Sequence, residues 1–96
     1  MRPSAAFEIH RDAIRAIVLS HRAVNARIFG SVARGEDHEG SDLDVLVDPT
    51  ASTSIIDIGL IQHELHALLG VDVDVLTPKA IAADFRDKVL AEAINV

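Results

Sequence analysis

Two aspartates spaced two residues apart are the residues of this sequence whose type and spacing best suit chemistry. Asp42 and Asp44 lie in a stretch that alternates polar and apolar residues, so both carboxylates project from one face of a predicted strand. Neighbouring carboxylates repel each other unless a cation lies between them. Their hard oxygens suit Mg²⁺, which takes one or two carboxylates together with substrate phosphates. Two solvated positions on a half-buried strand are the alternative interpretation.

A third aspartate has the same placement on a later predicted strand. Asp74 lies opposite the valine face of the segment 71–76, and Asp72 lies on the same side. If the valine faces of both strands meet the helices, Asp42, Asp44 and Asp74 share the other face of the sheet. Three carboxylates there are unfavourable unless they bind a metal ion. We therefore predict these three as metal ligands, with Asp72 as a substitute for Asp74.

The dipeptide Gly30-Ser31 lies at a predicted junction between a strand and a helix. Free backbone N–H groups and the positive end of the helix dipole favour a phosphate at such a junction. Glycine allows the phosphate to approach closely, and the Ser31 hydroxyl adds a donor. Arg34, one turn later, is placed to reach the same anion. We predict Gly30, Ser31 and Arg34 as phosphate-binding residues, and a plain helix cap is the alternative.

The hydrophobic periodicity of the first half of the chain predicts the elements that position these residues. A first amphipathic helix is expected from Ala6 to about His21. Its inward face would hold Ile9, Ala13, Ala16 and Ile17. A short strand follows at 26–29 and a polar loop at 36–41. The next strand, 42–48, would place Leu43, Val45 and Val47 on the face opposite the aspartates.

The second half begins with a capping box, Ser54-x-x-Asp57, that opens a helix closed by Gly70. The apolar stripe of this helix would hold Ile58, Ile61, Leu65 and Leu68. After the strand 71–76, Thr77-Pro78 opens a final helical region. Its inward residues would be Ala82, Phe85 and Val89. The predicted fold is a small α/β (α+β) fold, a mixed three- to four-stranded sheet with helices packed on one face.

Length and composition limit the classes of protein that fit. The 96 residues predict a single domain spanning 1–96. The net charge of −6 argues against direct nucleic-acid binding, and the absence of cysteine excludes thiolate chemistry. No apolar run or signal segment is visible, so a cytoplasmic location is expected.

Other catalytic and metal-binding motifs do not fit the sequence. No lysine follows Gly30-Ser31 as a P-loop requires, and Leu46 and Val47 occupy positions at which an EF-hand needs other residues. His63 and His66 are three residues apart, whereas the zinc-protease helix needs four, so they are interpreted as part of a polar helix face.

The motif as a whole resembles the polymerase-β-like nucleotidyltransferase superfamily. It consists of Gly30-Ser31, then Asp42-x-Asp44, then Asp74, and the stretch GSVARGEDHEGSDLDVLV is similar to the minimal nucleotidyltransferase (MNT) group. The resemblance implies the small nucleotidyltransferase fold and transfer of a nucleoside monophosphate, most plausibly AMP from ATP, to a hydroxyl.

The resemblance also implies a role for each motif residue. Asp42 and Asp44 would hold two Mg²⁺ ions, and Asp74 would complete the second metal site and help to deprotonate the acceptor. Gly30 and Ser31 would hold the β- and γ-phosphates. Such metals stabilise the charge that develops in an in-line displacement at phosphorus.

The resemblance further implies a protein partner. MNT proteins are typically paired with HEPN ribonuclease toxins, so the resemblance implies an antitoxin that adenylylates its HEPN partner on tyrosine and forms a hetero-oligomer with it. Because the chain is too short for an added substrate domain, the acceptor is expected on another molecule. Two alternatives stay open: an antitoxin that neutralises by binding alone, and nucleotidyl transfer to a small molecule.

Overall fold

The computed structural model describes residues 1–96, and its strands form one mixed sheet in the order β3-β2-β1-β4. β1 (Ala23–Phe29) runs antiparallel to both β2 (Leu43–Pro49) and β4 (Ile94–Asn95). β2 and β3 (Val73–Leu76) are parallel. The predicted α/β class with a mixed sheet is therefore confirmed, with a fourth strand supplied by the C-terminal residues.

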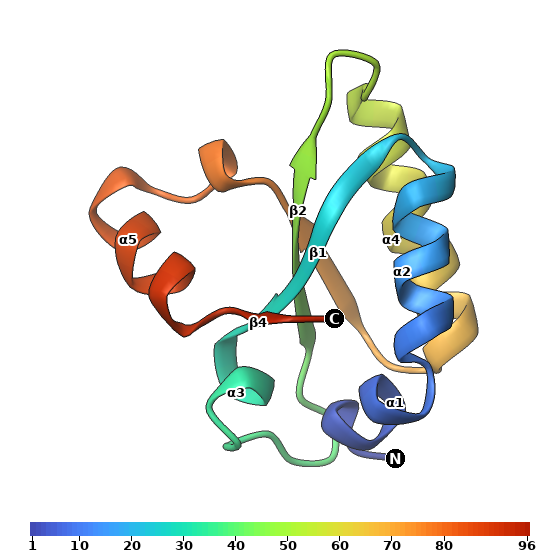
Figure 1. The fold of residues 1–96 in the computed structure, drawn as a ribbon. Helices are drawn as coiled ribbons and strands as arrows, with labels where there is room; N and C mark the ends of the chain where they lie inside the picture. Colours follow the sequence, from blue (N-terminus) through green and yellow to red (C-terminus); the bar gives the residue numbers. More distant parts are fainter.

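The helices are divided unequally between the two faces of the sheet. One face packs against α1 (Pro3–Ile9), α2 (Arg11–Ser20) and α4 (Ile55–Leu69). Figure 1 shows α2 and α4 on one side of the sheet and α5 (Ala83–Glu92) on the other. α5 buries none of its residues, so the packed helices lie on one face as predicted. No helix has both the length and the apolar character needed to cross a membrane.

The hydrophobic core lies between the sheet and the three helices of the packed face. The strands contribute the predicted alternating residues, and α4 contributes one stripe. Fully buried examples are Leu43, Val45, Val47, Ile61 and Leu65. Because side chains alternate along a strand, the aspartates between these core residues point to the opposite face, which we call the open face.

The N-terminal helix predicted as continuous from Ala6 is two helices. The chain breaks at His10, whose φ of −115° and ψ of 21° end α1. The fully inward residues are Phe7, Ile14 and Val18. Of the predicted apolar face, Ile17 packs against the core, but Ile9 is 64% exposed and Ala16 is also exposed, so the prediction was wrong at these two positions. The break resets the phase of the helix, and a stripe counted across it therefore follows the wrong residues.

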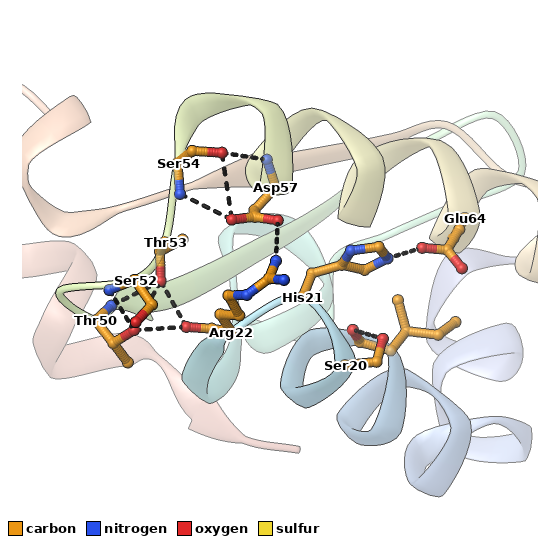
Figure 2. Close-up of polar contacts among 10 residues, drawn as sticks. Ser20, His21, Arg22, Thr50, Ser52, Thr53, Ser54, Asp57 and Glu64 are labelled. Carbon is orange, nitrogen blue, oxygen red and sulfur yellow. Dashed lines mark hydrogen bonds and ion pairs between the residues drawn. The ribbon is translucent and has the colours of Figure 1, made fainter.

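The start of α4 is built as the sequence predicted. The Ser54 hydroxyl accepts a hydrogen bond from the Asp57 N–H at 3.2 Å, and the Asp57 carboxylate accepts one from the Ser54 N–H at 2.8 Å (Figure 2). Gly70 ends the helix in the left-handed conformation. Leu69 is buried in place of the predicted Leu68, which is 36% exposed.

The C-terminal region differs most from its prediction. Thr77-Pro78 opens only a 3₁₀ turn, η1 (Pro78–Ala80), and α5 begins five residues after Pro78. The expected inward side chain Phe85 is 60% exposed, and Ala82 is exposed as well. On the open face η1 contacts β2, and α5 contacts β1 and the short helix α3 (Gly30–Ala33), so there is no second layer of helices against which α5 buries a stripe.

Candidate active site

The three predicted aspartates meet on the open face of the sheet. Asp42 directly precedes β2, and Asp44 is the second residue of that strand. In the strand register Asp44 pairs with Asp74 of β3 on one side and with Phe29 of β1 on the other. Asp74, and not Asp72, is therefore the neighbour of Asp44. The pairing places the carboxylates of two adjacent strands side by side at the point where β1 ends.

Asp44 is the electrostatic centre of this group. Burial, and after it the charges of Asp74 and Asp42, raise the pKa of its carboxyl group to about 6. The ion pairs within the chain all involve other carboxylates, so none balances the charge of these three. Arg34 is the cation that acts against the shift. The site is thus an acidic cluster whose three carboxylates form no ion pair within the chain.

Gly30 is required by the geometry around Asp44. It begins α3 (Gly30–Ala33) with a φ of +73°, a conformation that L-residues with side chains rarely adopt. A Cβ atom at this position would lie 2.2 Å from Oδ2 of Asp44. The carboxylate therefore packs directly on the Gly30 backbone. The predicted strand–glycine–helix junction is confirmed, and the glycine also makes room for the aspartate.

The other two residues predicted for phosphate binding flank Gly30. Ser31 is partly buried and is not the N-cap of α3, because that position is Phe29, which makes no side-chain cap bond. The alternative of a serine cap is therefore wrong. Arg34 follows one turn later, and its guanidinium lies 3.2 Å from Glu36 and 3.3 Å from Glu92. These two carboxylates, Glu36 first, raise the pKa of Arg34.

Glu92 is a residue of the site that the sequence analysis missed. Its carboxylate, at the end of α5, accepts a hydrogen bond of 3.1 Å from the Gly30 N–H as well as contacting Arg34. No local pattern marks it, because 62 residues separate it from Gly30. The pairing of β4 with β1 brings the end of α5 next to α3. Only recognition of a strand at residues 94–95 could have indicated from the sequence that Glu92 lies next to α3.

An open cleft of about 500 Å³ adjoins the acidic cluster at the β3 edge of the sheet. Asp42 and Asp74 line it on one side, and α4 lines it on the other with Gln62, His63 and His66. The two histidines are exposed, as expected for a polar helix face. A space of this size beside Asp74 is large enough to admit a side chain from another molecule.

The donor set of the site suits a magnesium ion that is shared with a substrate. Asp42, Asp44 and Asp74 present hard carboxylate oxygens from two rigid strands, and their mutual repulsion favours a bound cation. No three acidic or histidine side chains are close enough together to hold a metal ion with protein ligands alone. Mg²⁺ rarely uses an all-protein cage and takes waters and phosphates as further ligands. These residues therefore fit that metal.

The fold and site define a nucleotidyltransferase, and comparison with known proteins agrees. The nucleotidyltransferase domain family model matches residues 9–96, so the chain belongs to that family and is a nucleotidyltransferase. A solved structure of a candidate minimal nucleotidyltransferase superposes with a TM-score of 0.87 at 39% identity, covering 97% of this chain and 95% of that one. The predicted membership of the polymerase-β-like minimal group is confirmed.

Two relatives carry more specific names. A Methanocaldococcus jannaschii protein named as a candidate protein adenylyltransferase is 43% identical over 89 residues, covering 93% of this chain and 95% of its own length. The protein adenylyltransferase MntA of Thermococcus cleftensis is 36% identical over 72% of this chain and 70% of its own. A toxin–antitoxin crystal structure with AMP-PNP shares the fold, with a TM-score of 0.74 at 20% identity, over 88% of this chain and 69% of that one.

Proposed function

We propose that this chain transfers AMP from ATP to a hydroxyl group of a partner protein in a Mg²⁺-dependent reaction. The observation that carries the proposal is the half-buried Asp44, which lies in register with Asp74, two residues after Asp42, and forms no ion pair. An aspartate with only a structural role would destabilise the fold in this position, and no interaction would offset the loss. The names of the relatives favour adenylyl transfer over other nucleotidyl transfers.

Each motif residue has a role in this reaction. Asp42 and Asp44 hold the metal ions together with the nucleotide, and Asp74 completes the second metal position. When bound, Mg²⁺ neutralises the charge that develops on the phosphoryl oxygens. The acceptor oxygen bonds to the α-phosphorus as the bond to pyrophosphate breaks, and Asp74 takes the acceptor proton. Such a reaction demands orientation and charge from the protein rather than a covalent intermediate.

Gly30, Ser31 and Arg34 bind the nucleotide in this proposal. The Gly30 N–H and the Ser31 hydroxyl contact the β- and γ-phosphates, and the Arg34 guanidinium balances their charge. Gly30 and Ser31 begin α3, Arg34 directly follows it, and Gly30 packs on the Asp44 carboxylate, so the phosphates and the metal ligands would be adjacent. The acceptor enters from the other side, through the cleft lined by Asp74.

We infer that the acceptor belongs to a protein, a HEPN-type toxin modified on tyrosine, with which this chain forms a hetero-oligomer as the antitoxin. Structures of the same fold come from toxin–antitoxin complexes, which supports such a partner. α5 adds a further argument, because it exposes Phe85 and Leu90 on the helix whose end reaches the site through Glu92. Residues 1–96 act here as one domain, in the cytoplasm, where ATP is available.

Intact-mass spectrometry of both chains tests this function. The protein is incubated with the product of the adjacent gene, Mg²⁺ and ATP, and addition of AMP units to the partner is the expected result. A stable complex without added mass would instead support neutralisation by binding alone. A parallel reaction with a small-molecule hydroxyl acceptor tests the remaining alternative, which AMP added to that acceptor and not to the partner would support.

A further inference from the structure

Glu92 occupies the groups that the proposed function assigns to the nucleotide phosphates. Its Oε1 atom accepts the Gly30 N–H at 3.1 Å, and both of its carboxylate oxygens lie 3.3 Å from Nη1 of Arg34. The Glu92 side chain is 19% exposed, so the contact is largely shielded from water. A carboxylate bound by a backbone N–H and a guanidinium has the same hydrogen-bonding partners as a phosphate oxygen would have.

These contacts are incompatible with simultaneous phosphate binding. A single N–H donor serves one strong acceptor, and the Gly30 N–H is already engaged. Arg34 is also held on its other side, since its Nε donates to Glu36 at 3.2 Å. A triphosphate that arrived with Glu92 in place would meet an additional negative charge next to Asp44. The carboxylate of Glu92 must therefore leave before the phosphates bind.

α5 is built so that its end can move. None of its residues is buried, and helices with few buried contacts open at low free-energy cost. Arg86 donates hydrogen bonds to the carbonyl groups of Pro78 and Ile81, but these lie in the same segment and would move with it. Besides Glu92, the chain that follows α5 is tied to the sheet by the two residues of β4 and by Val96, whose N–H donates to the Ala26 carbonyl at 3.1 Å and whose side chain packs against the core. These anchors lie beyond Glu92, so the helix itself can move while the last residues stay paired with β1.

We propose that Glu92 is a built-in competitor of the nucleotide, which holds Gly30 and Arg34 in the free protein and is displaced when a triphosphate binds. This inference rests on the proposed function, because that function supplies the nucleotide. It adds a conformational step: the end of α5 is released from α3 as the phosphates take its place. Nucleotide binding and the position of α5 are then coupled.

Titration calorimetry with ATP and Mg²⁺ tests the competition in the wild type, Glu92→Gln and Glu36→Gln. Glu92→Gln keeps the shape of the side chain but removes its charge and ion pair, so ATP should bind about fivefold more tightly. Glu36→Gln is the matched control, because Glu36 also pairs with Arg34 but is 65% exposed and does not contact Gly30. It should change the affinity less than twofold.

Equal or weaker ATP binding by Glu92→Gln, or no binding by either protein, would overturn the competition. Measurement of AMP transfer to the partner separates this outcome from failure of the proposed function. Transfer by the wild type without an affinity gain in the variant contradicts only the competition. An affinity gain without any transfer supports the competition and contradicts only the enzymatic role.

Hydrogen exchange gives a second readout that does not depend on the variant. In the wild type, addition of ATP and Mg²⁺ should speed amide exchange in residues 83–92, because α5 loses its contact with α3. Exchange in α4, which is anchored in the core, should not rise. Slower or unchanged exchange in α5 on saturation with ATP would contradict displacement of Glu92.

Discussion

Two groups of aspartates in this small protein have opposite surroundings. Asp57 accepts hydrogen bonds from Ser54 and pairs with Arg22 at 3.2 Å (Figure 2). Asp37 has a side chain only 1% exposed, but it accepts the Ser4 N–H at 2.9 Å and lies 3.4 Å from Arg2. Asp44 is half-buried and faces two other carboxylates.

The pKa values express this difference. Hydrogen bonds from Ser54, aided by Arg22, lower the pKa of Asp57. Burial alone would raise the pKa of Asp37, but the Ser4 hydrogen bonds and Arg2 outweigh it and the pKa is lowered. Burial and neighbouring carboxylates raise that of Asp44. The first two aspartates stabilise the fold when ionised, whereas Asp44 destabilises it, and such a residue is typical of a functional site.

The largest expected effect is on catalysis at the acidic cluster. Asp44→Ala should lower AMP transfer to the partner by three or more orders of magnitude, because the metal charge that it holds stabilises the transition state. Ser31→Ala should lower transfer only about two- to tenfold, since one neutral hydrogen bond is lost and the backbone donors remain. The rates are measured by intact-mass spectrometry on variants that are monodisperse and refold reversibly, so that misfolding does not account for a lost activity. Equal rates for Asp44→Ala and the wild type would contradict the assignment.

Gly30 should show the next largest effect, on stability. Gly30→Ala places a Cβ atom 2.2 Å from the Asp44 carboxylate in addition to the strain of a φ of +73°. We expect a loss of about 3 kcal/mol in the free energy of unfolding, measured by urea denaturation. Gly35→Ala is the control, because its φ is +71° but no atom lies within 4 Å, and it should lose about 1 kcal/mol. Equal losses would mean that Gly30 and Asp44 are not in close contact.

Asp44→Asn should stabilise the protein at neutral pH by about 1–2 kcal/mol, a value reduced for solvent screening of a half-exposed group. The pKa of Asp44 in the folded protein, about 6, exceeds the ordinary value of 3.8 for an aspartate, so the folded state binds more protons between these values. Wild-type stability therefore falls as the pH rises from about 4 to 6. The variant should lack this part of the slope in pH-dependent urea unfolding. A variant less stable than the wild type at pH 7 would show that Asp44 has an unrecognised internal partner.

The smallest expected effect concerns the partnered aspartate of the capping box. Ser54→Ala removes the hydroxyl that accepts the Asp57 N–H and should lower the free energy of unfolding by about 1 kcal/mol. Ser52→Ala, two residues earlier on the exposed loop, should change it by less than about 0.5 kcal/mol. Thermal melts compare the two. If both variants have the same melting temperature as the wild type, the capping box contributes nothing to stability.

The parts of the fold that follow local rules were predictable from the sequence. The alternation around Asp44 and Asp74 predicted two strands with their aspartates on one face, and Ser54-x-x-Asp57 predicted the start of α4. Each signal depends on neighbours within a few residues. Gly30 at the end of a strand was recognised for the same reason.

The remaining features depend on distant contacts. The side-by-side register of Asp44 and Asp74 and the contact of Glu92 with Gly30 arise from strand pairing, which one sequence does not specify. The break at His10 was missed because no proline or glycine marks it. Phe85 was predicted to face inward because its spacing is helical, but periodicity does not reveal whether a surface is available to cover it.

Melting in the presence of Mg²⁺ and ATP tests most directly whether the unpartnered aspartates form the metal–nucleotide site. For the wild type, ligand at a hundredfold excess over its Kd should add about 2.7 kcal/mol to the free energy of unfolding and raise the Tm accordingly. Asp42→Asn combined with Asp44→Asn should abolish that gain. Asp72→Asn, which alters a carboxylate with a 78% exposed side chain that is not in register with Asp44, should retain it. A double variant that keeps the full Mg²⁺-dependent gain would contradict the account.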